Sequence, residues 1–335
     1  MPNTSSLTDA SALSAEPFLT NEPCSRPYAE RYPLIDTHTH FDEPVFIEDR
    51  AEQIVQTSDA GVRHLLLVGY LRHYFERMWE TQVQINTFDY QSLSLPQDIA
   101  PLRAHVVLGL HPVYIDQHTV EDLQVMQDSL ARHDDIIAIG EIGLDTFTPQ
   151  LKLPEVLAKQ KQYFNAQLDM AVAHELPVLL HIRKAHADVL KMLKQHRYDA
   201  HTLGGIAHSF SGGEQEAKAF VALGYKLGVT GQVTNPNAKK LRRALAAAVQ
   251  EYGLSCLVIE TDCPDMLPIM CQPTHASGLH NSEPHNSAPT RNTPANLPHV
   301  LATLSELFAV PLPELATQLW HNSCAALNVS WSYPK

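Results

Sequence analysis

Short apolar runs alternate with amphipathic stretches along almost the whole chain, and this alternation limits the possible folds more than any other feature. We expect eight strands, at residues 34–37, 64–69, 104–109, 136–140, 178–181, 205–208, 225–228 and 257–260. Helices are expected near 48–60, 71–86, 119–133, 154–175, 184–196, 213–223 and 237–251, with two more near 293–308 and 312–327. Strands separated by helices pair in parallel, and eight such units favour a closed TIM-type (β/α)8 barrel in a single domain.

The main alternative to a barrel is an open, doubly wound sheet that binds a nucleotide. No G-x-G-x-x-G follows the first expected strand, which weakens that alternative. A length of 335 residues, with 44% hydrophobic and 18% charged residues, is ordinary for one large globular domain.

Two segments fall outside the alternation. Residues 1–32 are rich in Ser, Pro and Glu and predict a flexible polar tail before a barrel over 33–328. Residues 264–292 carry many Pro, His, Ser and Asn and little periodicity. This long loop follows the eighth strand, so we place it at the mouth of the barrel, where it either shapes substrate access or is disordered.

The overall charge restricts the possible partners. Lys and Arg total 24 against 37 Asp and Glu, which gives a net charge of −13 and argues against non-specific duplex binding. An enzyme that acts on one end of a nucleic acid remains compatible, because bound metal ions offset a local negative field.

Cysteine usage and hydropathy restrict the compartment. Five cysteines without a C-x-x-C pair argue against a disulfide framework, and we do not expect Cys263 and Cys271 to bind zinc. No apolar run reaches the ~18–20 residues of a membrane span, and the start of the chain does not resemble a secretory signal. We therefore expect a cytoplasmic protein with no membrane contact, and no feature indicates a stable protein partner.

Titratable side chains recur where the expected strands end. His38 and His40 are spaced i, i+2 after the first strand, so in an extended chain they point to the same side. Taken alone, this pair fits either a metal site or a loop with two exposed histidines. Five later expected strands also end in a titratable residue: His111, Glu141, His181, His208 and Asp262. Active sites of parallel barrels are built at the carboxyl ends of the strands, so these residues are candidates for one site.

These residue types suggest metal chemistry. Histidine and carboxylate ligands without a thiolate suit zinc, magnesium or manganese. The set exceeds what one catalytic ion needs, so two divalent ions are plausible, with Glu141 as a bridging ligand. Asp262 suits two roles, as a ligand and as the base that accepts a proton from the attacking water.

The same segments resemble the TatD-type metal-dependent deoxyribonucleases, a family of amidohydrolase-like barrels, over residues 33–328. They are Ile35–Asp42 (IDTHTHFD), Gly109–Pro112 (GLHP), Gly140–Asp145 (GEIGLD), Leu179–His181 (LLH), His208–Gly212 (HSFSG) and Glu260–Asp265 (ETDCPD). Among the branches of the family, the chain looks most like the YjjV-type hydrolases. The resemblance implies a (β/α)8 barrel with divalent metals that hydrolyses phosphodiesters, often from the 3′ end of single-stranded DNA.

Carried over by position, the resemblance also implies a ligand arrangement. His38, His40, Glu141 and Asp262 would surround one ion, and Glu141, His181 and His208 the other. One departure concerns the substrate side, because Ile182 follows His181 where a small hydroxyl residue is usual in the family.

Substrate contacts are predicted at three further positions. Arg183 either grips a phosphate or forms a surface salt bridge, and His111 contacts a phosphate or supports a ligand. Asp145 orients a ligand histidine or binds Arg183. Arg291 and Asn292 open a late helix, where a structural cap is the simpler interpretation than an anion site.

Two other functions remain open from the sequence. A small-molecule hydrolase that acts on a lactone, amide or phosphoester would use the same metal site, and the acidic net charge favours it. A non-catalytic binding protein would keep the barrel, but it has no physical need for six converging ligands.

Overall fold

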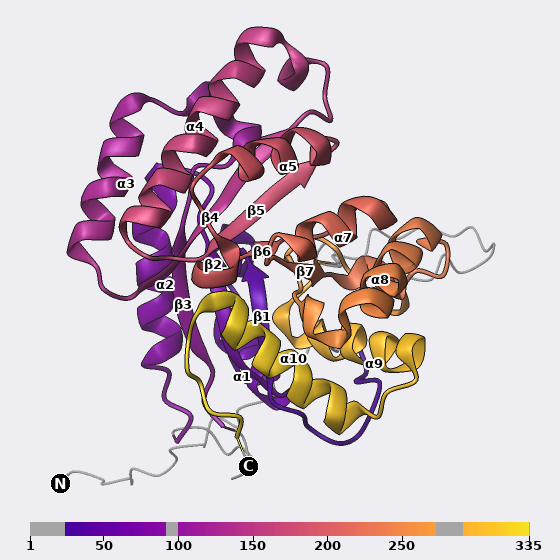
Figure 1. Cartoon of the computed structure of the whole chain (residues 1–335). Helices are drawn as coiled ribbons and strands as arrows, with labels where there is room; N and C mark the ends of the chain where they lie inside the picture. The colour runs from indigo at the N-terminus through magenta and orange to yellow at the C-terminus, as the bar shows by residue number, and fades with distance from the viewer. Residues whose placement is uncertain (1–23, 92–99, 273–290, 335) are drawn as a thin grey trace, which may run out of the picture.

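The computed structural model describes residues 24–91, 100–272 and 291–334 and contains an eight-stranded parallel barrel (Figure 1). Strand order follows the chain: β1 (Leu34–Thr39), β2 (Val62–Val68), β3 (Arg103–Leu108), β4 (Ile136–Asp145), β5 (Val178–Arg183), β6 (Ile206–Ala207), β7 (Lys226–Val229) and β8 (Leu257–Ile259). Each strand pairs with the next one in the chain. The predicted TIM-type (β/α)8 fold is therefore confirmed.

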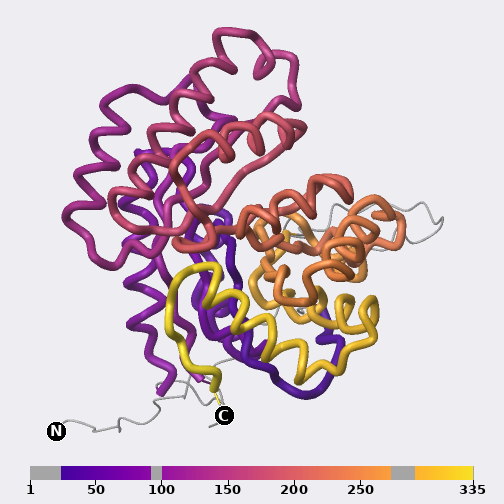
Figure 2. Tube along the Cα trace, in the orientation of Figure 1, coloured from indigo at the N-terminus to yellow at the C-terminus, as the bar shows by residue number. Residues whose placement is uncertain are grey.

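Helices connect the strands and form the outer layer (Figures 1 and 2). They are α1 (Arg50–Asp59), α2 (Phe75–Asn86), α3 (Val120–Arg132), α4 (Pro154–Ala173), α5 (His186–Gln195), α6 (Ala200–Leu203), α7 (Glu214–Ala222), α8 (Lys239–Tyr252), α9 (Leu297–Phe308) and α10 (Leu312–Leu327). The sequence predicted all of these except the four-residue α6. β4 runs to Asp145, beyond its predicted end, because it pairs with β5 as far as Arg183.

Alternation along the strands fills the barrel and also orients the site. On β2, Leu65 and Leu67 join the layer between strands and helices, while Leu66 and Val68 join a separate buried cluster inside the barrel. Residues spaced by two share a face of a strand. The inward line of Leu66 and Val68 therefore continues to Tyr70 at the carboxyl end.

The barrel closes through irregular contacts between β1 and the residues after β8. The Asp262 N–H donates to the His38 carbonyl at 2.9 Å, and the His40 N–H donates to the Cys263 carbonyl at 2.8 Å. Thr37 Oγ1 donates to the Ile259 carbonyl at 3.2 Å. These bonds bring the first predicted ligand pair beside the last one.

One disulfide departs from the expectation drawn from the odd cysteine count. Cys24 and Cys271 are bonded, while Cys256, Cys263 and Cys324 are free and buried. The two bonded residues are 247 positions apart, and only the fold brings the segment before β1 to the loop after β8.

The described ends of the two irregular segments lie against the barrel. Tyr28 and Tyr32 pack partly on the core, and Arg31 pairs with Asp59 at 2.5 Å. The predicted tail otherwise falls on residues 1–23, and most of the predicted mouth loop falls on 273–290, which lie outside the described residues. The domain limits at 32 and 328 stay a prediction.

Within the part of the chain that the structure describes, no single helix is long and apolar enough to cross a membrane. α9 and α10 meet the length and composition requirement only as a pair, with a bend of 112° between them. Both helices bury side chains in the barrel core.

Two histidines lie close together far from the carboxyl ends of their strands. His64 Nδ1 is 2.9 Å from His105 Nε2, and the Trp331 ring stacks on both imidazoles. Burial, with the neighbouring His105, lowers the pKa of His64 to about 3, and burial lowers the pKa of His105 to about 4. Both side chains are therefore neutral in the folded protein at ordinary pH.

This pair makes the barrel acid-sensitive. The folded pKa values lie below the ~6.5 of an unfolded histidine, so unfolding takes up protons and stability falls as the pH drops from 6.5 towards 4. Between pH 7.5 and pH 5 we expect each histidine to contribute a loss of about 2 kcal/mol in the free energy of unfolding. Urea titrations at both pH values measure this loss in the free energy of unfolding. The loss should be smaller for the double variant His64→Gln/His105→Gln than for the exposed control His321→Gln. Equal losses would refute the proposed effect of this histidine pair.

Candidate metal centre and active site

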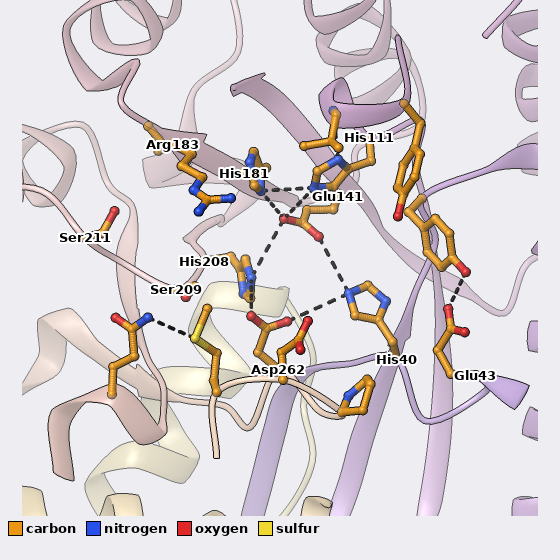
Figure 3. A pocket seen from close by; sticks show the side chains of 18 residues that line it. His40, Glu43, His111, Glu141, His181, Arg183, His208, Ser209, Ser211 and Asp262 are labelled. Carbon is orange, nitrogen blue, oxygen red and sulfur yellow. Dashed lines mark hydrogen bonds and ion pairs between the residues drawn. The ribbon is translucent and has the colours of Figure 1, made fainter. Parts of the chain in front are cut away.

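A cavity of about 640 Å³ opens at the carboxyl ends of the strands (Figure 3). Segments at or after the carboxyl end of every strand contribute to its lining. From β1 to β8 the contributing residues include His40, Tyr70, His111, Glu141, His181, His208, Gln232 and Asp262. The predicted convergence of strand-end residues is thus what the structure contains.

Glu141 lies at the centre of the cluster, and its two oxygens face different histidines. Oε1 is 2.6 Å from His181 Nδ1 and 3.2 Å from His111 Nε2. Oε2 is 3.3 Å from His38 Nε2 and 3.9 Å from His40 Nε2. A carboxylate placed in this way can be shared between two ions.

Within this cluster, three groups of donors are close enough to hold an ion. His38, His40 and Glu141 form one group, His38, His208 and Asp262 a second, and His111, Glu141 and His181 a third. His208 Nε2 lies 3.5 Å from Asp262 Oδ2 and 3.8 Å from Glu141 Oε1. The family resemblance implied two separate ligand sets, one around each ion. In the structure His208 lies close to members of both.

Two of the histidines have an outer ring nitrogen held by an oxygen acceptor. His40 Nδ1 is 3.0 Å from the Val68 carbonyl, and His181 Nε2 is 3.0 Å from Asp145 Oδ2. In the neutral ring, a proton on the outer nitrogen leaves a lone pair on the inner one, which is the usual arrangement of histidine ligands. His208 Nδ1 is 2.9 Å from Glu260 Oε1, but it makes no hydrogen bond among the described residues, so Glu260 acts on His208 through its charge.

His38 supports the presence of an ion more directly. Its side chain is fully buried, and neither ring nitrogen has a hydrogen-bond partner among the described residues. Leaving a buried polar nitrogen without a partner costs about 1–3 kcal/mol. A divalent ion beside Nε2, Glu141 and Asp262 would satisfy one of these nitrogens, so the residues fit a metal.

His111 differs from the other histidines in its tautomer. Its Nδ1 accepts the backbone N–H of Val113 at 3.0 Å, so the neutral ring carries its proton on Nε2. Nε2 lies 3.0 Å from His181 Nδ1 and points into the cluster (Figure 3). While the Val113 N–H stays bonded to Nδ1, the Nε2 of His111 carries the proton and is a hydrogen-bond donor rather than a metal ligand.

Neighbouring charges in the cluster shift the pKa values of its side chains in the direction opposite to the effect of burial. Burial works to raise the pKa of Glu141, but His111, His208 and His38 hold it well below the usual value. The pKa of Asp262 is likewise lowered by His208 despite burial. Burial opposes the charge on His181, yet Glu141 and Asp145 raise its pKa to about 9. Both carboxylates are therefore ionised at neutral pH.

The predicted substrate residues line or border the cavity. Arg183 lines it, and its guanidinium lies 3.7 Å from the centre of the Phe147 ring. No ion pair joins it to a carboxylate within the described ranges. Asp145 contacts His181 and also accepts the Phe147 N–H at 2.7 Å.

Arg291 and Asn292 lie in structural contacts rather than at an open helix start. Arg291 Nη2 is 2.5 Å from both oxygens of Asp49. The buried Asn292 side chain donates to the Thr261 carbonyl at 2.9 Å.

Two kinds of site residue were missed from the sequence. Glu260 is fully buried behind His208, and a Cβ at Gly228 would lie 2.4 Å from its carboxylate oxygen, so any side chain at position 228 would displace this carboxylate. Tyr70 and Tyr114 line the cavity with ring centres 5.4 Å apart. Alternation along β2 could have placed Tyr70, but the role of Glu260 depends on which strands become neighbours.

A parallel barrel whose carboxyl ends gather buried histidines and carboxylates around a cavity defines a metal-dependent hydrolase. The comparisons with known proteins agree. A profile of the TatD related DNase family matches residues 35–328. The chain is 34% identical to the "uncharacterized metal-dependent hydrolase YjjV" of Escherichia coli K12, over 88% of this chain and 98% of that one.

Two further relatives extend this result. The crystal structure of the same Escherichia coli protein superposes with a TM-score of 0.70 at 32% identity, covering 89% of this chain and 98% of that chain. A protein of Pantoea sp. named "3′-5′ ssDNA/RNA exonuclease TatD" is 27% identical over 87% of this chain and 97% of its own length. The chain belongs to the TatD family of metal-dependent hydrolases.

Ion binding should be measurable without any substrate. A divalent ion at 100 times its dissociation constant stabilises a folded protein by about 2.7 kcal/mol per site. For a chain of this size we expect magnesium, manganese or zinc to raise the melting temperature by about 5 °C. Glu141→Gln should lose most of this rise, because it removes the charge shared by two donor groups.

The matched control is Glu43→Gln, which removes a cavity carboxylate that belongs to none of the donor groups. It should keep the ion-dependent rise, and a chelator should reverse the rise in both the wild type and this control. An undiminished rise in Glu141→Gln would place the ions elsewhere.

Proposed function

We propose that this protein is a 3′-5′ exodeoxyribonuclease that hydrolyses single-stranded DNA with two divalent ions. The observation that carries the proposal is the position of Glu141, whose two oxygens face separate sets of histidines. The names of several relatives, which are 3′-5′ ssDNA/RNA exonucleases, support the substrate. The identity of the ions stays open between magnesium, manganese and zinc.

The first ion would be held by His38, His40, Glu141 and Asp262, and the second by Glu141, His181 and His208. The bound ions would supply acidity to a nearby water molecule and charge compensation to the phosphate. The intermediate position of His208, 3.5 Å from Asp262 and 3.8 Å from Glu141, also allows it to bind the first ion.

Asp262 is the proposed proton acceptor. Its carboxylate lines the cavity, and its lowered pKa keeps it ionised at neutral pH. It would take a proton from the attacking water on the side of the cluster that faces His38 and His40. Glu260 would act as a positioning residue through its charge, which lies 2.9 Å from Nδ1 of His208.

The phosphate would be gripped from the opposite side of the cavity. Arg183 is the one lysine or arginine among the described residues that line it. The guanidinium is stacked on Phe147 and forms no ion pair with any described residue, so its N–H groups are available for two phosphate oxygens. The Nε2–H of His111 is a second donor, which favours the phosphate-contact role over a ligand role.

An aromatic wall offers a place for the terminal base. Tyr70 and Tyr114 line the cavity beside His40, and the Tyr70 and His40 ring centres are 5.5 Å apart. Bases of single strands stack on such rings with little dependence on sequence. One grip for a phosphate and one stacking wall suit the end of a strand better than a long duplex.

The acidic lining also favours a second candidate. Glu43, Glu141, Asp262 and Asp265 face the cavity against a single arginine. A small lactone, amide or phosphoester would meet less repulsion than a polyanion, and it would use the same ions. The non-catalytic alternative has no comparable observation in its favour.

A 3′-labelled single strand tests the leading candidate directly. With manganese or magnesium bound, we expect stepwise shortening of the DNA from its 3′ end. Asp262→Asn should reduce turnover by at least about 10²-fold, because general-base catalysis contributes that much or more. Asp265→Asn, three residues along the same loop, is the matched control and should stay near the wild-type rate.

Two results would redirect the assignment. Near-normal turnover by Asp262→Asn, with an unchanged melting temperature, would exclude its role as the base. Absence of DNA cleavage by the metal-loaded protein, together with turnover of a lactone or small phosphoester, would favour the second candidate.

Arg183 should act mainly on substrate binding. Removing a charge-assisted contact to a phosphate costs about 1.5–3 kcal/mol, so Arg183→Gln should raise the KM for DNA by roughly 10-fold or more. The effect on kcat should be smaller. The control is Lys184→Gln, which removes the same charge from the next residue, outside the cavity lining. In steady-state kinetics its KM and kcat should stay close to those of the wild type. Equal effects of both variants would argue for a general charge effect.

A further inference from the structure

The disulfide between Cys24 and Cys271 involves the loop after β8, part of which lines the active-site cavity. Cys271 belongs to the loop after β8, whose earlier residues Pro264, Asp265 and Met266 line the cavity. Cys24 comes from the segment before β1, so the bond ties the start of the barrel to its last loop. Both cysteines are partly exposed, whereas the three free cysteines are buried.

A buried histidine lies beside the two sulfur atoms. His299 on α9 is 3% exposed, and its Nδ1 has no hydrogen-bond partner among the described residues. One of its ring nitrogens and the two Sγ atoms all lie within 4.8 Å of one another. A disulfide offers an imidazole little hydrogen bonding, but a thiol or thiolate is a hydrogen-bond partner for a ring nitrogen at this distance.

A chain of contacts leads from Cys271 to the backbone beside Asp262. Cys271 Sγ lies 3.8 Å from Asn296 Oδ1, and Asn296 Nδ2 donates to Asn292 Oδ1 at 3.0 Å. Asn292 in turn donates from its side chain to the Thr261 carbonyl at 2.9 Å and from its backbone to the Pro264 carbonyl at 2.9 Å. The loop is thus held to the barrel partly through the residues that surround the disulfide.

We propose that Cys24, Cys271 and His299 form a reversible thiol–disulfide site whose oxidation state sets the mobility of the loop after β8. The oxidant is a small disulfide of the glutathione type. In a reducing compartment the pair would be open, and the bonded form would be the oxidised state. The site stands independently of the proposed nuclease activity, because its chemistry involves neither the ions nor DNA.

The exchange runs through two balanced steps. One protein thiolate attacks the small disulfide, forms a mixed disulfide and expels one small thiolate. The second protein thiolate then attacks the protein sulfur of the mixed disulfide, which closes the Cys24–Cys271 bond and expels the second small thiolate. Two electrons pass from the protein sulfurs to the oxidant, and the protons lost by the cysteines are taken up through His299 or by the expelled thiolates.

Thiol counting on the full chain tests the site. After equilibration in glutathione buffers and trapping under denaturing conditions, the reduced chain should expose all five thiols and the oxidised chain three. The change should be reversible within the range of the buffers, and mass spectrometry should find Cys24 joined to Cys271. A pair that stays bonded in fully reduced glutathione would be a purely structural disulfide, and the proposal would fail.

Hydrogen exchange tests the effect on the loop. Reduction should speed amide exchange in the peptide that covers residues 262–272 by about tenfold, because a tether is lost. Cys24→Ser should show the fast rate under both conditions, whereas Cys324→Ser, which removes a free cysteine, should behave like the wild type. Equal rates in oxidised and reduced wild type would overturn the link to the loop.

The role of His299 has its own readout. Burial lowers the pKa of His299, so its imidazole is neutral and can accept a proton from a neighbouring thiol. We expect this proton transfer to speed exchange near pH 7 by about threefold. His299→Asn should slow oxidation by that factor, and the exposed control His321→Asn should not. A different result would refute the redox proposal. If the reduced protein binds one zinc ion, if Cys24→Ser abolishes this binding, and if the pair does not oxidise reversibly, the cluster is a metal site.

Discussion

The seam between β1 and the residues after β8 is the contact on which the active site depends. Here the two ends of the barrel exchange backbone hydrogen bonds, from Asp262 to His38 and from His40 to Cys263. The buried carboxyl group of Asp36 accepts from both the N–H and the hydroxyl of Thr261, at 2.9 and 2.6 Å. A slip of one residue would reverse the side-chain directions on one side of the seam, and His38 and His40 would no longer face Asp262.

The seam also orients ligands on other strands. Glu260, which directly precedes Thr261, accepts the Thr37 hydroxyl at 3.1 Å and the Ser209 N–H at 2.6 Å, and it lies beside the ring of His208. Strands β1, β6 and β8 therefore meet at one buried carboxylate. The carboxylate that joins the seam therefore also places a negative charge beside His208, so the barrel closure and the charge around this histidine depend on the same side chain.

Sequence reasoning found what periodicity and strand order determine. The i, i+2 spacing of His38 and His40, and the strand-end positions of Glu141 and Asp262, needed only the expectation of a parallel barrel. Tyr70 follows the same alternation on β2 and could have been included. Glu260 and the Cys24–Cys271 bond could not, because their partners are set by tertiary packing between segments far apart in the chain. The tautomer of His111 depends on a local turn that places the Val113 N–H against its ring.

The charge distribution gives the ions a second role besides chemistry. The chain carries a net charge of −13, and the cavity presents four carboxylates to a single arginine. Without ions, a polyanionic strand would meet a repulsive field that the histidines only partly offset. The two divalent ions of the proposed function would add four positive charges at the place proposed for the phosphate, and buried ions are weakly screened by salt. DNA binding and catalysis would then depend on the same ions, so an ion-free molecule would not retain its substrate.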